Sequence, residues 1–438
     1  MSWCCQKSTL MLNWKQFSFN YKHMKNKFFL GSLAIVVAAL LWSLDGTFLR
    51  PGLFSLPSPL LVFLEHLLGF VVLAPFLFIY RTQLKEINKK SWAAIFWVAL
   101  FGGALGTTFF TKALFATGFV DISVVILLQK FQPIFAIILA AIFLRERFPR
   151  EFYAYAGLAV VAGYFVTFKD PLTVSGVWGA PAQAALFSLL AAFAWGSSTV
   201  FGKYSLKNLN HGLLAALRFG LTVLIMVFPA LYFYGAGISA VAGKQWWTLI
   251  AIVFSSGAVA MFLYYWGLKK VPASVSTLCE LAWPVSAIIF DYFLNGNILS
   301  ATQIIGAFIL VFAAYRATAL NQPITFTGKV LPGQGKGEEV GAKTANLDVA
   351  LAEKLPPGLY DCVVTTEVGG IYSGLLYYGY NSLSQKNCLE VHLLNFSGDL
   401  KGQEITVTTK RFLRLPKKFN SLDGLKSKVE EDLKKANN

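Results

Sequence analysis

The stretch VDISVVILLQKFQP, residues 120–133, is matched later in the chain by VPASVSTLCELAWP, residues 271–284. In this alignment Val120 pairs with Val271, Gln129 with Glu280, and Pro133 with Pro284. Each stretch opens an apolar segment directly after a loop. The pairing predicts that the chain contains two copies of one helical unit.

Apolar segments recur on both sides of these stretches, and ten of them are predicted to cross a membrane. They are residues 29–48, 59–80, 92–111, 122–144, 152–168, 178–201, 212–234, 246–267, 272–294 and 298–318. About 20 apolar residues are needed to cross a hydrocarbon core about 30 Å thick, and the fifth segment is at the short limit. Only 14% of the residues are charged, against about 25% in soluble proteins. The sequence therefore predicts a polytopic α-helical membrane protein.

The ten segments divide into two sets of five, residues 29–168 and 178–318. A second pair of stretches, AALLWSLDGTF (38–48) and AAFAWGSSTVF (191–201), aligns Trp42 with Trp195. Because five is odd, the second copy would enter the membrane upside down, an inverted repeat that is typical of transporters. The alternative is a chance likeness between apolar helices, which landmarks in the same order argue against.

Positive charge predicts the orientation. Residues 322–438 hold 15 Lys/Arg against 13 Asp/Glu, whereas residues 1–321 hold 23 against 9. This excess lies in loops between apolar segments, which argues for a lipid bilayer as partner and against nucleic acid. The connections between consecutive apolar segments lie alternately on the two sides of the membrane. Seventeen basic residues lie on one side, and the other side has four: Arg50, Lys112, Lys169 and Lys244. The positive-inside rule then places both termini in the cytoplasm, in a multi-pass protein of the inner (cytoplasmic) membrane.

Residues 1–28 form the predicted cytoplasmic N-terminal segment. The run MKNKFFLGSLAIVV, from Met24, is a natural start for a membrane protein of this kind. We therefore expect residues 1–23 to be a disordered extension, and the sequence leaves open whether they are translated.

The stretch LFATGFVDISVVILLQKFQPIFAIILAAIFLRERF, residues 114–148, has a proline-containing helix followed by an Arg-Glu-Arg loop. In this and in the five-plus-five pattern, residues 29–318 resemble the EamA-type members of the drug/metabolite transporter superfamily. The resemblance implies transport of a small organic solute. It leaves the solute, the direction, the coupling ion and the oligomeric state open, with a homodimer among the options.

Polar side chains inside the apolar segments are candidates for solute contacts, because a charge at a helix centre costs about 3 kcal/mol. Charged or titratable groups occur there at Asp45, Glu65, His66, Lys130, Arg218, Glu280 and Asp291. Glu280 and Gln129 occupy equivalent repeat positions, and aromatic walls would stack on an aromatic solute. The predicted transport cavity consists of Trp42, Asp45, Gln129, Trp195 and Glu280. The alternative is structural pairing, with Lys130 neutralising Glu280 or Asp45, or snorkelling at helix ends.

After a linker at residues 319–323, the composition changes to short alternating segments. Five of them are predicted strands: residues 324–331, 358–367, 370–380, 388–396 and 403–414. From Ser421 onward, apolar residues fall on one helical face. Residues 324–438 are therefore predicted to form a small soluble antiparallel β-barrel with a C-terminal helix.

The tail contains a glycine-rich, basic stretch, GKVLPGQGKGEEVGAKTANL, residues 328–347. Glycines let backbone N–H groups approach an anionic ligand closely. The predicted phosphate-binding residues are Gly333, Gly335, Lys336, Gly337 and Gly341, and Thr344 and Asn346 offer oxygens of the kind that Mg²⁺ prefers. The stretch does not have the Walker pattern, and an ordinary glycine-rich loop is the alternative.

Four stretches of the tail, GKVLPGQGKGEEVGAKTANL, LPPGLYDCVV, CLEVHLLNFSGDLKG and LRLPKKFNSLDGLKSKVEEDLKKA, resemble the riboflavin kinase family of bacteria and eukaryotes. The resemblance implies transfer of phosphate from ATP to riboflavin, giving FMN. It implies that Thr344 and Asn346 meet Mg²⁺ and phosphate, that Glu390 is the general base, and that Arg414 lies near the flavin. A carboxylate suits the removal of a proton from an attacking hydroxyl, although Glu390 on a strand has the alternative of being an exposed surface group.

The tail departs from the family pattern at three places. Lys343 stands where the family usually has proline, and Lys401 stands where it usually has tyrosine. The run RLPKKF lacks an acidic residue that is common there. These changes leave Thr344, Asn346 and Glu390 intact, so we expect an active kinase, with a decayed domain as the alternative.

Together the two resemblances predict a transporter that imports riboflavin and a cytoplasmic tail that phosphorylates it. Two alternatives remain: a transporter of another metabolite whose tail is a flavin- or nucleotide-binding regulator, and a kinase tethered by a vestigial transporter.

Overall fold

The computed structural model describes residues 26–116, 125, 128–167, 182–296, 298, 300–332, 344–353, 355–381, 385–417 and 422–436. It divides into two compact units, one made of Phe29–Glu146 and Ala154–Thr318, the other mainly of Ala319–Asn438. The predicted phosphate-binding residues Gly333, Gly335, Lys336, Gly337 and Gly341 lie outside the described residues, as does the segment 1–25.

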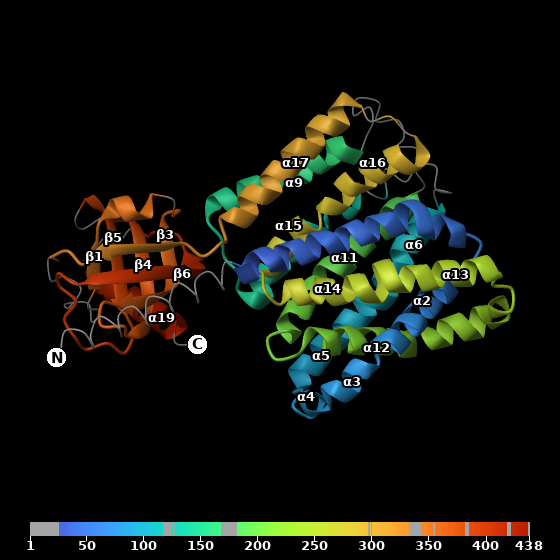
Figure 1. Ribbon diagram of the computed structural model, residues 1–438, viewed down its shortest axis with the longest axis horizontal. Coiled ribbons are helices and arrows are strands. Elements are labelled where there is room, and N and C mark those ends of the chain that lie inside the picture. Colours follow the sequence, from blue (N-terminus) through green and yellow to red (C-terminus); the bar gives the residue numbers. More distant parts are fainter. Residues whose placement is uncertain are drawn as a thin grey trace, which may run out of the picture. The chain divides into compact units, whose positions relative to one another are not determined.

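The first unit is helical (Figure 1). Six of its helices are long and apolar enough to cross a membrane: Asn26–Leu53, Lys89–Ala116, Gln183–Ser205, His211–Tyr234, Gly243–Leu268 and Ala301–Ala319. Shorter elements are α2 (Ser58–Leu73), α3 (Pro75–Ile79), α4 (Arg81–Lys85), α8 (Gln132–Leu139), α9 (Arg150–Thr167), α15 (Ala273–Cys279) and α16 (Ala282–Asn295). The unit is that of a multi-pass membrane protein, and the total of ten spans stays a prediction.

Four helices in the described part of this unit contain a π-helical segment, which widens the helix and shifts its backbone hydrogen bonds by one residue. Three lie within long helices: η1 (Asp45–Leu49), η3 (Val98–Leu105) between α5 (Lys89–Trp97) and α6 (Gly106–Ala116), and η6 (Val253–Gly257) between α13 (Gly243–Ile252) and α14 (Ala258–Leu268). The fourth, η4 (Ala140–Leu144), follows α8. The hydropathy pattern does not indicate these segments.

Two helices break at the repeated stretches. A turn at residues 130–131 precedes α8, and another at residues 280–281 separates α15 from α16. The sequence predicts unbroken helices over 122–144 and 272–294, so the structure corrects both predictions. Pro133 and Pro284 follow the turns closely, and each removes a backbone N–H that a continuous helix needs.

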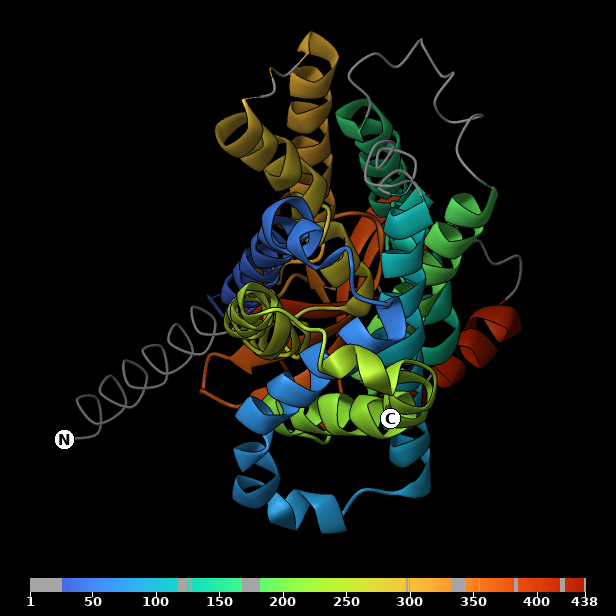
Figure 2. The same ribbon diagram turned by 90° about the vertical axis from the view of Figure 1, so that its right-hand side faces the viewer.

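Small residues allow close helix crossings. A Cβ atom at Gly102 would overlap Ser198 of α11 (Ala182–Ser205), and one at Gly103 would overlap Thr222 of α12 (His211–Tyr234). Helices α9 and α17 (Ala301–Ala319) lie side by side in Figures 1 and 2. Close packing of this kind between small residues is a main source of helix association in lipid.

The tail forms a curled antiparallel sheet with the strand order β1-β6-β3-β4-β5-β2. Its strands are β1 (Thr325–Lys329), β2 (Thr344–Leu347), β3 (Gly358–Thr366), β4 (Ile371–Asn381), β5 (Lys386–Leu393) and β6 (Glu404–Arg414). A 3-10 turn, η7 (Val349–Ala352), follows β2, and helix α19 (Leu422–Ala436) ends the described chain. The predicted strands are confirmed, whereas β2 was not predicted.

The two ends of the sheet approach each other. Just after β1, the amide of Leu331 donates a hydrogen bond to the carbonyl of Asn346 in β2 at 2.8 Å. Alternate strand residues face the core, among them Val364, Leu376, Val391 and Val407. The curled sheet and the final helix agree with the prediction, and complete closure into a barrel stays a prediction.

Candidate functional site

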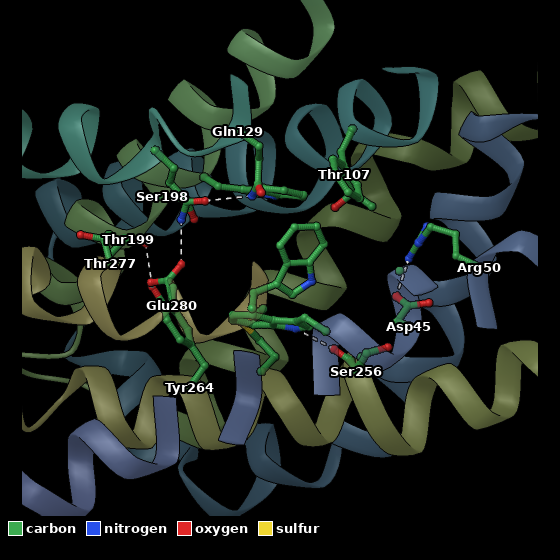
Figure 3. Close-up of a pocket in the computed structure, with 18 of the residues that line it drawn as sticks. Asp45, Arg50, Thr107, Gln129, Ser198, Thr199, Ser256, Tyr264, Thr277 and Glu280 are labelled. Atoms are coloured by element: carbon green, nitrogen blue, oxygen red, sulfur yellow. Dashed lines mark hydrogen bonds and ion pairs between the residues drawn. The ribbon is translucent and has the colours of Figure 1, made fainter. Parts of the chain in front are cut away.

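The helical unit encloses a cavity of about 190 Å³ (Figure 3). All five predicted cavity residues line it: Trp42, Asp45, Gln129, Trp195 and Glu280. The lining comes from the first helix, from the two turns at 130–131 and 280–281, and from residues of α2, α6, α8, α11, α12, α13, η6, α14, α15 and α16. Discontinuous helices around a central cavity are typical of transporter solute sites.

At one end, a hydrogen-bond network joins the two broken helices. Glu280 accepts hydrogen bonds from Gln132 Nε2 at 2.7 Å and from Tyr264 Oη at 3.0 Å. Gln129 Nε2 donates in turn to Gln132 Oε1 at 3.1 Å. The repeat-equivalent residues Gln129 and Glu280 are thus brought together through Gln132, which the sequence analysis did not single out although it directly precedes Pro133.

At the other end lies a cluster of buried charges. Arg50 Nη2 is 2.9 Å from Asp45 Oδ2 and 3.0 Å from Glu65 Oε1, and each of the three side chains is less than a tenth exposed. Arg50 was counted as a loop charge, and the structure corrects this assignment. Its position before Pro51 suggests a loop in the sequence. Asp45 precedes it by five residues in the same helix, whereas Glu65 becomes its neighbour only when the first helix packs on α2.

Widened helical turns hold the cavity side chains in place. Trp42 Nε1 donates to the carbonyl of Ser256 in η6 at 2.9 Å. Trp195 Nε1 and Arg218 Nη2 donate to the carbonyl of Gly102 in η3, at 3.1 and 2.6 Å. Because a π turn leaves some carbonyls without a normal helical partner, these oxygens are open to side-chain donors.

Aromatic rings form the walls between the two ends. The rings of Trp42 and Tyr264 lie with their centroids 5.3 Å apart. Lys130 Nζ lies 4.3 Å from the centroid of Trp283, a cation–π geometry. The suggestion that Lys130 neutralises Glu280 or Asp45 is therefore not needed to explain its burial. Flat aromatic walls with polar ends suit a solute that combines a ring system with polar groups.

The tail brings three predicted site residues onto one face of the sheet. Asn346 of β2 lies directly opposite Glu390 of β5, and Thr344 lies opposite His392 in the same register. Their neighbours Ala345 and Val391 point into the core, so Thr344, Asn346 and Glu390 share the outer face. Directly opposed side chains have Cβ atoms about 5 Å apart. The hydroxyl, amide and carboxylate oxygens gathered there fit the oxygen ligands that a divalent cation prefers.

Tyr377 of β4 lies opposite Glu390 on its other side. Burial, with smaller contributions from the neighbouring Cys388 and Glu390, raises the pKa of Tyr377 to about 12, so its hydroxyl stays protonated at neutral pH. That hydroxyl donates to the carbonyl of Tyr380 at 3.0 Å. Tyr377 is therefore a neutral neighbour of the carboxylate.

Arg414, predicted to lie near the flavin, is at the end of β6. Its Nη2 and Nε atoms bind Asp432 Oδ2 of α19 at 2.6 and 2.9 Å. Asp432 is 4% exposed. In this structure Arg414 therefore anchors the final helix, and contact with a flavin stays a prediction.

Comparison with known proteins agrees with both units. The model of the EamA-like transporter family matches residues 29–168 and 182–318, and that of riboflavin kinase matches residues 320–438. The riboflavin transporter ImpX of Fusobacterium nucleatum subsp. nucleatum is 40% identical over 296 residues, covering 66% of this chain and 98% of that protein. A solved crystal structure with 18% identity and a TM-score of 0.51, covering 66% of this chain and 96% of that one, shares the fold.

The tail has relatives of its own. A bifunctional riboflavin kinase/FMN adenylyltransferase of Pseudomonas fluorescens is 31% identical over 144 residues, covering 32% of this chain and 46% of that protein. The chain thus spans less than half the length of this relative. The chain belongs to the EamA-like transporter family and carries a riboflavin kinase family domain at its C-terminal end.

Proposed function

We propose that the membrane unit imports riboflavin and that the fused tail phosphorylates it to FMN with ATP. The observation that carries this proposal is that both parts point to one vitamin. A relative that is 40% identical and matched over 98% of its length is named a riboflavin transporter, and the tail matches the riboflavin kinase family. Fusion of the two parts in one chain makes a shared substrate the simplest reading.

Phosphorylation would trap the vitamin. A phosphate ester carries about −1.5 to −2 charges at pH 7, and an isolated charge is strongly disfavoured in a hydrocarbon core. Import would then run down the riboflavin gradient without a coupling ion, because the kinase keeps the internal concentration low. This scheme places both termini of the chain in the cytoplasm, at the inner membrane, where ATP is available.

In the transporter we propose an inverted repeat of residues 29–168 and 178–318 with ten spans. Trp42, Asp45, Gln129, Trp195 and Glu280 would contact the solute. The two broken helices at equivalent positions of the repeat, which both reach the cavity, support this arrangement.

In the tail, residues 324–438, we propose a closed barrel in which Glu390 accepts the proton of the attacking hydroxyl. Thr344 and Asn346 would hold Mg²⁺, which when bound neutralises phosphate charge. The glycine-rich loop, with Gly333, Gly335, Lys336, Gly337 and Gly341, would bind the phosphates of ATP, and Arg414 would lie near the flavin. The shared face of Thr344, Asn346 and Glu390 supports these roles.

Vesicles that contain the intact chain, loaded with ATP and Mg²⁺, test the proposal. External riboflavin should appear inside as FMN. The variant Glu390→Gln should lower FMN formation at least about 100-fold, the usual contribution of a general base, while riboflavin still equilibrates across the membrane. Glu353→Gln, which changes an exposed carboxylate of the tail, is the matched control and should alter neither step.

Two outcomes would contradict the proposal. If riboflavin enters but no FMN forms with the unaltered chain or with the Glu390→Gln variant, the tail is a regulator and not a kinase. If the tail makes FMN from riboflavin supplied inside but none enters from outside, the membrane unit only tethers it.

A further inference from the structure

The two ends of the transport cavity differ in their hydrogen-bonding state. Glu280 accepts from Tyr264, Gln132 and Ser276, at 3.0, 2.7 and 3.3 Å. These donors use three of the roughly four acceptor positions of a carboxylate. Figure 3 shows Glu280 and Asp45 on opposite sides of the cavity. The end with Asp45 is served by fewer donors.

The cluster of Asp45, Arg50 and Glu65 has more acceptors than donors. One guanidinium nitrogen of Arg50 serves both carboxylates, while its other terminal nitrogen lies 3.4 Å from Thr111 Oγ1. Asp45 Oδ1 is buried and accepts no hydrogen bond from the residues that the structure describes. Asp45 as a whole is 7% exposed and lines the cavity. A buried acceptor without a donor is unfavourable, so a hydroxyl that reached this oxygen from the cavity would stabilise the cluster.

We infer that the cluster of Asp45, Arg50 and Glu65 is the polyol-binding end of the cavity and makes the transporter selective for the ribityl chain. The inference rests on the proposed import of riboflavin, which combines a flat ring system with a chain of hydroxyls. The hydroxyls donate to Asp45, and the ring lies among Trp42, Tyr264 and Trp283 on the side toward Glu280. The hydroxyl chain thus meets the end with fewer donors, and the ring meets the aromatic walls.

A hydroxyl chain suits this end better than a cation or a phosphate ester does. Arg50 already places a positive charge between the two carboxylates, and the described residues contain no group of three His, Cys, Asp or Glu that could hold a metal ion. A phosphate at the end of the chain would bring negative charge toward Asp45 and Glu65, which like-charge repulsion disfavours. The same cluster that accepts the alcohol therefore excludes its phosphate ester.

Competition for uptake tests this selectivity on the unaltered chain. Vesicles without ATP are given labelled riboflavin together with external lumiflavin, which carries a methyl group in place of the ribityl chain, or with FMN. Each competitor should inhibit only at a concentration about tenfold or more above that of unlabelled riboflavin. For lumiflavin this is the factor expected for one lost hydrogen bond to a charged acceptor, and for FMN the cause is repulsion by the two carboxylates. This part of the test does not depend on whether any variant folds.

The variant Asp45→Asn locates the selectivity, because the amide keeps the size of the side chain but loses an acceptor oxygen. The half-saturation concentration for riboflavin should rise about tenfold, while inhibition by lumiflavin should change less than twofold. Glu86→Gln, at an exposed carboxylate outside the cavity, is the matched control and should leave both values unchanged.

The outcomes separate this inference from the proposed function. Vesicles that take up no riboflavin overturn the proposed import. Vesicles that take up riboflavin, but in which lumiflavin or FMN competes as well as riboflavin does, overturn the polyol-binding end alone. An Asp45→Asn chain that loses riboflavin and lumiflavin equally also overturns it, since the residue would then act on the ring or on folding.

Discussion

Arg414 and Asp432 form a largely buried ion pair in the tail, with two guanidinium nitrogens on one carboxylate oxygen at 2.6 and 2.9 Å. Their side chains are 18% and 6% exposed. Removing one partner of a buried pair leaves the other charge without compensation, which typically costs about 3–5 kcal/mol. The partial exposure of Arg414 lowers this figure through solvent screening.

We predict that Asp432→Asn lowers the free energy of unfolding of the tail by about 1–3 kcal/mol, because the arginine loses its charged acceptor. Amide hydrogen exchange of the intact chain is the measurement, and faster exchange should be concentrated in α19. The control is Glu431→Gln, which alters an exposed partner of Lys428 and should change stability by less than about 0.5 kcal/mol. Unchanged exchange in α19 after Asp432→Asn would show that the pair does not hold the helix.

Sequence comparison between the two repeated stretches singled out individual residues, and their role in transport stays a prediction. The alignment of Gln129 with Glu280 and of Trp42 with Trp195 singled out four residues that line one cavity. Arg50 was missed because it follows the predicted end of the first apolar segment at residue 48, and because its second partner, Glu65, lies on another helix. Its proximity to Asp45, five residues earlier in the sequence, was the one available signal.

At the scale of elements, α9 and α17 pack against each other, and their glycines differ in packing. A Cβ at Gly306 of α17 would lie 2.9 Å from Phe165 Cβ and 3.1 Å from the backbone of α9, whereas a Cβ at Gly157 of α9 meets nothing within 4 Å. The helix pair is also joined by Gln303 Nε2, which donates to the carbonyl of Val166 at 3.3 Å. The two glycines therefore offer a matched test of close helix packing.

We predict that Gly306→Ala destabilises the membrane unit by about 1–3 kcal/mol, because the backbone of α9 must move. Gly157→Ala should instead be neutral or stabilising by up to about 1 kcal/mol, since alanine favours a helix over glycine. Thermal unfolding of both variants of the full chain in detergent is the measurement. Equal shifts for the two variants would contradict the packing argument.

Regular patterns made most elements predictable, and short or interrupted ones were not. The strands β3, β4, β5 and β6 were expected within three residues of their observed ends, because apolar and polar residues alternate along them. Strand β2 was missed because it has only four residues and because those residues were considered only as candidate metal and phosphate ligands. The breaks at 130–131 and 280–281 coincide with polar residues, among them Lys130 and Glu280, which were interpreted as candidate solute contacts and not as helix breaks. The π turns have no hydropathy pattern that distinguishes them from an α-helix.

At the scale of the whole molecule, the proposed trapping depends on charge and not on the covalent link. The relative ImpX is matched over 98% of its length by 66% of this chain, so a membrane unit of this kind exists as a separate protein. Suppose that FMN accumulates only because its phosphate cannot recross the bilayer. Joining the two units then shortens only the distance that riboflavin travels between transporter and kinase. The link would not change where the equilibrium lies.

We therefore predict that separate membrane and tail units, co-reconstituted in equal amounts with the tail inside the vesicles, reach the same final FMN content as the intact chain. Both preparations receive the same concentrations of external riboflavin, internal ATP and internal Mg²⁺. A tail carrying Glu390→Gln is the control and should accumulate no FMN. The final FMN content per vesicle, measured after lysis, is the quantity to compare. If the separated units accumulate far less FMN while the enclosed tail remains an active kinase, direct transfer of riboflavin within the fused chain drives retention, and simple trapping by charge is wrong.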